Sequence, residues 1–198
     1  MPGVWVAGEL QGKDTAAGGT ATIEISAGGV TSSAKAELKP GERAFLIKVP
    51  LQKSSAQADV RARFVPGSSG VTIPMTYTAR VGAPGGLTPP VIFRRGPTTG
   101  NRLQPVAGFQ FSRSERARLE VPLGAGDKPG EGRLLDKAGK PLQIPVAISE
   151  RTEAESGQRW MVADLTLAAL GAGEYAIELS ADTRNGRKSV LTAVRVTR

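Results

Sequence analysis

Apolar and polar residues alternate in many short segments of the chain, and the clearest case is the stretch 170–198. Large apolar residues occupy every second position of 175–179, a period of two that places them on one face of a strand. Asn185-Gly186 follows, a pair that we expect to supply the two positive φ angles of a tight hairpin turn. Residues 190–196 alternate again. The stretch therefore predicts a complete β-hairpin.

The start of this hairpin carries a second signal. Leu170, Gly173 and Tyr175 are arranged as in the corner of immunoglobulin-like sandwiches, where a tyrosine hydroxyl bonds back to the preceding loop. We therefore expect the hairpin to close a β-sandwich.

The same alternation predicts further strands throughout the chain, and no helix longer than one turn. Gly28-Gly29 and the segment 39–42 are predicted to form tight turns, and Pro74 indicates an edge strand or a bulge. Loops are expected at 124–132 and 149–158, and a hairpin turn at 136–140. The predicted strands before the final hairpin are 4–10, 20–26, 30–38, 45–49, 58–64, 71–81, 116–121, 144–148 and 160–167.

The composition supports an all-β chain of two domains. The 25 glycines and 14 prolines are enough to end many short strands. The uncharged segment 82–90, rich in both residues, is the best candidate for a linker. We predict two tandem immunoglobulin- or fibronectin III-like β-sandwich domains, at 1–83 and 91–198, joined by a linker at 84–90.

The chain has no histidine and no cysteine, which excludes His-based catalysis, thiolate metal sites and disulfides. Its acids fall in loops or at positions of strands that we expect to face solvent. We therefore expect no enzyme activity and no cofactor. Six carboxylates could supply oxygen ligands to Ca²⁺, but their spacing matches no known calcium-binding loop, so no specific calcium site is expected. These residues are Asp127, Glu131, Asp136, Glu150, Glu153 and Glu155.

The net charge of +8 allows two interpretations. An excess of arginine favours an anionic partner, but the charges alternate in sign and form no long run, as on an ordinary soluble surface. Nucleic-acid binding is not expected, because Phe109 and Phe111 are the only aromatic residues near the arginines of 113–118 and are predicted to face the core.

The sharpest local feature is the segment 94–102, RRGPTTGNR. Its arginine forks and backbone N–H groups could bind a carboxylate or phosphate of a partner. Alternatively, the loop packs over the end of its own sandwich, with its arginines paired to nearby acids. The candidate partner-binding residues are Arg94, Arg95, Thr98, Thr99, Asn101 and Arg102.

Two further observations concern location and ligands. No run of 18 apolar residues exists, so no membrane span is expected, and the first residues do not resemble a secretion signal. Because they enter a predicted strand at once, we expect the chain to be part of a longer protein. Trp5 and Trp160 are predicted to be core residues, with sugar stacking as the alternative.

The runs PPVIFRRGPTTGNRLQPVAGFQFSRSERARLEVPL (89–123), GRLLDKAGKPLQIPV (132–146) and RWMVADLTLAALGAGEYAIEL (159–179) carry a family resemblance. This region of about 110 residues resembles the C-terminal region of von Willebrand factor A-related domain proteins of acidobacteria. The resemblance implies β-sandwich modules that follow an A-type domain. The metal-ion adhesion motif of the A domain, Asp-x-Ser-x-Ser, does not occur here, so metal-dependent adhesion is carried over to no residue.

Together these observations predict a non-catalytic structural or protein–protein interaction module. Its expected partner is another protein or subunit of an envelope or surface assembly, and its expected location is extracytoplasmic, in the periplasm or at the cell surface. Loops or strand edges would bind the partner. Two alternatives remain: a carbohydrate-binding module, and an anion-binding module that uses the 94–102 loop.

Overall fold

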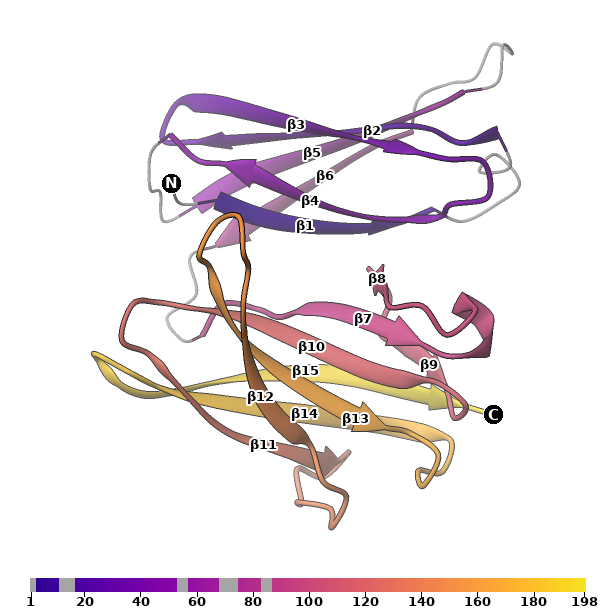
Figure 1. Ribbon diagram of the computed structural model, residues 1–198, viewed down its shortest axis with the longest axis vertical. Helices are drawn as coiled ribbons and strands as arrows, with labels where there is room; N and C mark the ends of the chain where they lie inside the picture. The colour runs from indigo at the N-terminus through magenta and orange to yellow at the C-terminus, as the bar shows by residue number, and fades with distance from the viewer. Residues whose placement is uncertain (1–2, 11–16, 53–56, 68–74, 83–86) are drawn as a thin grey trace. The chain divides into compact units, whose positions relative to one another are not determined.

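The structure is a computed structural model that describes residues 3–10, 17–52, 57–67, 75–82 and 87–198. The chain is nearly all β and forms two compact units, one mainly of residues 1–83 and the other mainly of residues 84–198 (Figure 1). Residues 84–86 of the predicted linker lie outside the described residues. Each unit is described by itself below.

The first unit contains a two-stranded sheet, β1-β4, and a four-stranded sheet in the order β3-β2-β5-β6. All strand pairs in it are antiparallel. Its strands are β1 (Gly3–Glu9), β2 (Gly19–Ala27), β3 (Val30–Leu38), β4 (Ala44–Pro50), β5 (Gln57–Pro66) and β6 (Met75–Gly82).

The core of this unit is formed by the apolar residues that alternate with polar residues along its strands. Ile23 and Ile25 of β2 are fully buried, whereas Glu24 between them points to the opposite face of the sheet. Val49 of β4 and Phe64 of β5 belong to the same apolar cluster. Burial of each such side chain contributes about 1.5–3 kcal/mol to folding.

Two predicted turns of the first unit are confirmed. Gly28 and Gly29 have φ angles of 57° and 78° and connect paired strands as a two-residue hairpin loop. The N–H of Glu42 donates to the carbonyl of Lys39 at 2.9 Å, and Gly41 has a φ of 82°. Pro74 lies outside the described residues, and β6, which follows it, forms one edge of its sheet.

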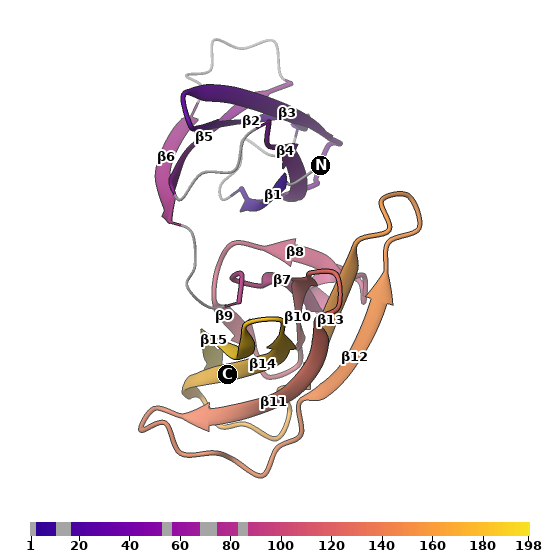
Figure 2. The same cartoon turned by 90° about the vertical axis from the view of Figure 1, so that its left-hand side faces the viewer.

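The second unit consists of a five-stranded sheet, β12-β13-β10-β7-β8, and a four-stranded sheet, β11-β14-β15-β9 (Figure 2). The pairing of β9 with β15 is parallel. The strands are β7 (Val91–Arg95), β8 (Gln104–Val106), β9 (Gln110–Ser112), β10 (Arg116–Leu123), β11 (Lys128–Asp136), β12 (Ala147–Thr152), β13 (Arg159–Thr166), β14 (Gly173–Thr183) and β15 (Gly186–Thr197). The only helical segment described in this unit is the 3-10 turn η2 (Pro97–Thr99).

Each sheet of this unit has one face of buried apolar side chains, as expected for a β-sandwich. Leu119 of β10 and Met161 of β13 are fully buried in the five-stranded sheet, and Ile177 and Leu179 of β14 are fully buried in the other. The prediction of an all-β sandwich architecture is confirmed at this level.

The closing hairpin forms as predicted, with one correction. The hydroxyl of Tyr175 donates to the carbonyl of Gly171 at 3.0 Å, which is the expected corner contact. Gly186 has the expected positive φ, 92°. Asn185 does not, since Asn101 is the only non-glycine residue with a positive φ among the residues that the structure describes. The N–H of Asn185 instead donates to the hydroxyl of Thr183, so that side chain fixes the turn.

Both predicted loops of the second unit are too long. The expected loop 124–132 enters β11 at Lys128, where a register shift between Pro129 and Gly132 accommodates the glycines in a paired strand. The expected loop 149–158 begins only after Thr152, because 147–152 pair with β13. The predicted strand 144–148 correspondingly starts at Ala147. In both places, strand pairing overrides a local composition typical of loops.

Candidate functional site

The 94–102 segment is a compact turn between β7 and β8. Gly100, with a φ of 58°, and Asn101, also with a φ of 58°, take consecutive left-handed conformations after η2. Glycine adopts this conformation without steric cost, and asparagine tolerates it better than most residues. These two residues reverse the chain toward β8.

The backbone N–H groups of this turn are used inside the turn. Those of Thr99 and Asn101 donate to the carbonyl of Gly96, that of Gly100 to Pro97, and that of Arg102 to Thr99. The N–H of Gly96 donates to the hydroxyl of Thr99, which lies 2.6 Å from the carbonyl of Arg102. These N–H groups are therefore not turned toward an external anion.

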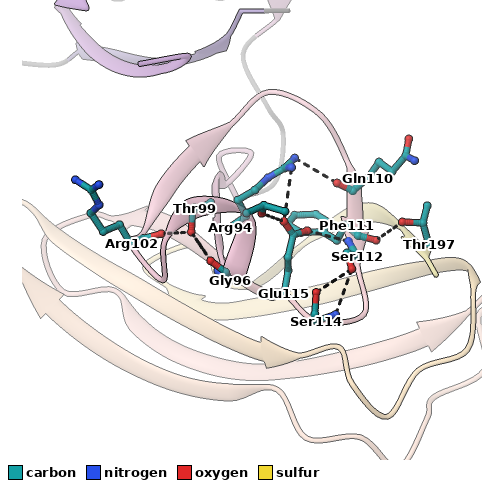
Figure 3. Close-up of polar contacts among 11 residues, drawn as sticks. Arg94, Gly96, Thr99, Arg102, Gln110, Phe111, Ser112, Ser114, Glu115 and Thr197 are labelled. Atoms are coloured by element: carbon teal, nitrogen blue, oxygen red, sulfur yellow. Dashed lines mark hydrogen bonds and ion pairs between the residues drawn. The ribbon is translucent and has the colours of Figure 1, made fainter. Parts of the chain in front are cut away.

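A buried carboxylate holds the turn from the other side (Figure 3). Glu115 is 2% exposed, and one of its oxygens accepts a hydrogen bond from the Thr98 hydroxyl at 2.6 Å. Its other oxygen accepts the N–H of Ser112 at 2.8 Å, and Arg94 lies 3.8 Å away as an ion pair. Glu115 thus connects η2 to the turn that precedes β10.

Arg94 is also held by neighbours beyond Glu115. Its guanidinium donates to the carbonyl of Gln110 at 3.3 Å and lies 5.5 Å from the ring centroid of Phe111. These contacts of Arg94 agree with the alternative prediction, in which the loop packs on its own unit and its arginines pair with nearby groups.

The backbone of Gly96 passes close to this carboxylate. A Cβ atom at position 96 would lie 2.9 Å from Cγ and 3.1 Å from Cα of Glu115. Because the φ of Gly96 is 175°, any residue could adopt its conformation. Glycine is therefore required by space and not by backbone geometry.

The six candidate residues separate into two groups. Arg94 and Thr98 converge on Glu115, and the side chain of Thr99 is buried within the turn. The exposed residues Arg95, Asn101 and Arg102 remain accessible.

Arg95 and Asn101 also line an open groove of about 680 Å³ on the second unit. Arg102 does not line it. The groove extends over the ends of β7, β10 and β13 and the segment before β12. Its other lining residues are Leu103, Arg116, Arg118, Gln143, Ile144, Pro145, Ala147, Asp164, Leu165, Thr166, Ala168 and Ala169.

Strand register orders the polar residues of this groove. Arg116 of β10 lies opposite Arg95 of β7 on one side and opposite Thr166 of β13 on the other. Two residues further along, Arg118 lies opposite Asp164. The groove floor therefore has two rows of polar side chains across the sheet.

The second row is a closed ion pair. Arg118 donates from Nε and Nη2 to the two oxygens of Asp164, at 2.8 and 2.9 Å. These hydrogen bonds raise the pKa of the Arg118 guanidinium above its ordinary value, against the opposing effect of its partial burial. Two parallel N–H···O bonds of this kind fix both side chains in place.

This ion pair continues into a buried carboxylate. Glu120 is 3% exposed and accepts hydrogen bonds from Arg151, while Arg118 lies 4.0 Å from its other oxygen. The expectation of a solvent-facing strand position is thus wrong for Glu120. Glu115 lies in a loop, as expected for the acids, but it is buried as well. Each carboxylate is paired with an arginine from another strand, a nonlocal arrangement that the alternation of residues does not reveal.

The predicted aromatic positions have mixed outcomes. Trp160, 1% exposed, and Phe111, 1% exposed, are core residues as predicted, whereas Phe109 is 53% exposed, which contradicts its expected core position. Trp5 is half-buried, with the ammonium of Lys48 5.2 Å from its ring centroid. The backbone carbonyl of Phe109 accepts the N–H of Arg195, so pairing to β15 fixes its backbone while its ring stays outside.

Three of the acids considered as calcium ligands are each held by partners of their own. Asp127 accepts the N–H of Gly124, Asp136 accepts two N–H groups of its own turn, and Glu150 pairs with Arg159. In the part of the chain that the structure describes, no group of three or more acids is placed to hold a metal ion. Among those same residues, no helix is long and apolar enough to cross a membrane.

Comparisons with known proteins do not identify a family. No model of a known protein family matches the chain, and no curated protein matches it either.

The sequence does not reveal the roles of two components of this site. Glu115 and Arg116 are recognisable from the sequence only as members of the charged stretch 113–120. The burial of Glu115 depends on its contacts with Thr98 and Ser112, and the place of Arg116 opposite Arg95 depends on the pairing of β7 with β10.

Proposed function

We propose that the chain is a non-catalytic protein–protein interaction module of tandem immunoglobulin- or fibronectin III-like sandwich domains. The observation that carries the proposal is the groove described above, which combines exposed arginines with apolar side chains on a sheet face. Arginine is enriched in protein interfaces, and apolar side chains in a defined pocket give such interfaces much of their binding energy.

The rigidity of the neighbouring turn supports this role. The turn is held by its own hydrogen bonds and by Glu115, so Asn101 and Leu103 would meet a partner with little loss of conformational freedom. The corner contact of Tyr175 supports the immunoglobulin-like assignment.

The two buried carboxylates support a binding role over a catalytic one. Glu115 accepts hydrogen bonds from Thr98 and from the N–H of Ser112, and Glu120 accepts them from Arg151. Carboxylates held in this way stabilise a fold and do not present a free oxygen to a substrate.

The proposal extends to the setting of the module. The resemblance of residues 89–198 to the region after the A domain in von Willebrand factor A-related proteins supports an extracytoplasmic location within a longer chain. A carbohydrate-binding role has less support, because Trp160 is buried and cannot form an exposed stacking platform.

Site-specific photo-crosslinking in the source organism's envelope fraction tests the proposed function. A photoreactive amino acid at the exposed groove residue Gln143 should give a discrete protein adduct, whereas one at Arg184, in the β14–β15 turn outside the groove lining, should not. Adducts from both positions or from neither would refute the proposed interface, and recovery of glycan alone would favour the carbohydrate alternative.

A further inference from the structure

The floor of the groove holds two like charges side by side. Arg95 and Arg116 are direct register partners on neighbouring antiparallel strands, and both line the groove. Residues directly opposite each other on one sheet face have Cβ atoms only about 4.5–5.5 Å apart. Both arginines are also exposed.

Nearby acids do not neutralise this pair. Asp164 accepts hydrogen bonds from Nε and Nη2 of Arg118, and Glu115 accepts them from the Thr98 hydroxyl and the N–H of Ser112. Within the described residues, neither Arg95 nor Arg116 forms an ion pair. Among these residues, the Arg95 side chain makes one hydrogen bond, from Nε to the carbonyl of Asn101 at 2.9 Å. Its two terminal nitrogens are therefore available to a ligand.

Two like charges directly opposite each other destabilise a sheet, and an anion bound between them removes that cost. Thr166 lies on the other side of Arg116 and also lines the groove, so its hydroxyl adds a donor to the same row. The row Arg95–Arg116–Thr166 therefore has the donors that a carboxylate needs.

The apolar lining narrows the class of ligand. Leu103, which is 41% exposed, lines the groove together with Ile144 and Pro145. A single small anion would leave these side chains and most of the 680 Å³ unused. No aromatic side chain is among the described residues that line the groove, so the stacking that single-stranded nucleic acid requires has no platform here.

We infer that the groove binds an acidic peptide segment of another protein, with a carboxylate between Arg95 and Arg116 and a neighbouring apolar side chain against Leu103, Ile144 and Pro145. This inference rests on the proposed function and names the partner's chemistry. Charge complementarity supports it: three arginines and one aspartate line the groove, which gives it a net charge of +2.

Selection from a displayed library of random dodecapeptides, with the whole 198-residue chain as bait, tests the inference. Enriched peptides should combine Asp or Glu with an adjacent large apolar residue. Arg116→Gln should weaken binding of the best peptide at least tenfold in fluorescence polarisation. Arg184→Gln removes the same charge outside the groove lining and should change binding less than twofold.

Three results would overturn the inference: no enrichment, enriched peptides without acids, or equal weakening by the two substitutions. Heparin retention that falls more with Arg116→Gln than with Arg184→Gln, without acidic peptides in the library, would assign the site to a polyanion instead. A crosslinked protein partner from Gln143 that persists in Arg116→Gln would leave the proposed function intact and refute the acidic-peptide ligand alone.

Discussion

The hydroxyl of Thr98 donates to the buried carboxylate of Glu115 at 2.6 Å, and this contact joins η2 to the turn before β10. Glu115 also accepts the N–H of Ser112 and pairs with Arg94. One side chain thus supports both the 94–102 turn, which contributes Asn101 to the groove, and the start of the strand that carries Arg116.

Replacement of Glu115 by Ala should destabilise the second unit by roughly 3 kcal/mol, because Thr98 and the Ser112 N–H lose their acceptor and Arg94 loses its counter-charge. Urea unfolding of the whole chain measures this. Glu174→Ala, which removes an exposed pair with Arg195, is the matched control and should cost less than about 1 kcal/mol. Equal losses would show that Glu115 is not a central support.

Gly96→Ala should destabilise the fold by about 1–3 kcal/mol, since the new methyl group meets Glu115 at less than normal contact distance. Gly171→Ala is the control: a Cβ there has Tyr175 Oη at 3.8 Å as its nearest neighbour, an ordinary contact. Thermal unfolding should therefore show a loss at position 96 and almost none at 171. A neutral Gly96→Ala would mean that the loop can move away from Glu115.

Tyr175→Phe removes only the hydroxyl that donates to Gly171, and should cost about 1 kcal/mol of unfolding free energy. Hydrogen exchange of the backbone amides at 170–174 should increase in this variant if the corner holds the segment before β14. Unchanged stability together with unchanged exchange would contradict a structural role for the contact.

Glu150 should titrate below the ordinary range of a glutamate, because the hydrogen bond from Arg159 lowers its pKa. The pair therefore stabilises the fold above the unfolded-state pKa of about 4.3, and this contribution is lost as pH falls through the lower folded-state pKa. A carbon-detected NMR titration of the Glu150 carboxyl should show the low midpoint. Arg159→Gln should raise that midpoint and Arg184→Gln should not; the same midpoint in all three proteins would refute the pairing.

The sequence predicts the strands and turns of the second unit correctly where the residue pattern favours the structure that strand pairing also requires, as in the closing hairpin and the Tyr175 corner. It fails where strand pairing imposes a structure that the residue pattern does not favour. Pro129 and Gly130 are typical of a loop, yet they lie in β11, whose register with β14 shifts at this point.

The candidate site was predicted only in part for the same reason. The segment 94–102 was visible as a cluster of unusual composition, but which of its arginines are held and which are exposed depends on Glu115 and on strand order. Arg95 and Arg116 are 21 positions apart in the sequence, and only the register of β7 with β10 makes them neighbours.

The parallel pairing of β9 with β15 links this site to the end of the chain. The Thr197 hydroxyl donates to the carbonyl of Phe111, 86 positions earlier, and the N–H of Arg113 donates to the carbonyl of Thr197. The segment that supplies the Ser112 N–H to Glu115 is therefore held by a strand that follows it much later in the sequence. During synthesis this support can form only after β15 has emerged from the ribosome, so the turn around Glu115 reaches its final form late.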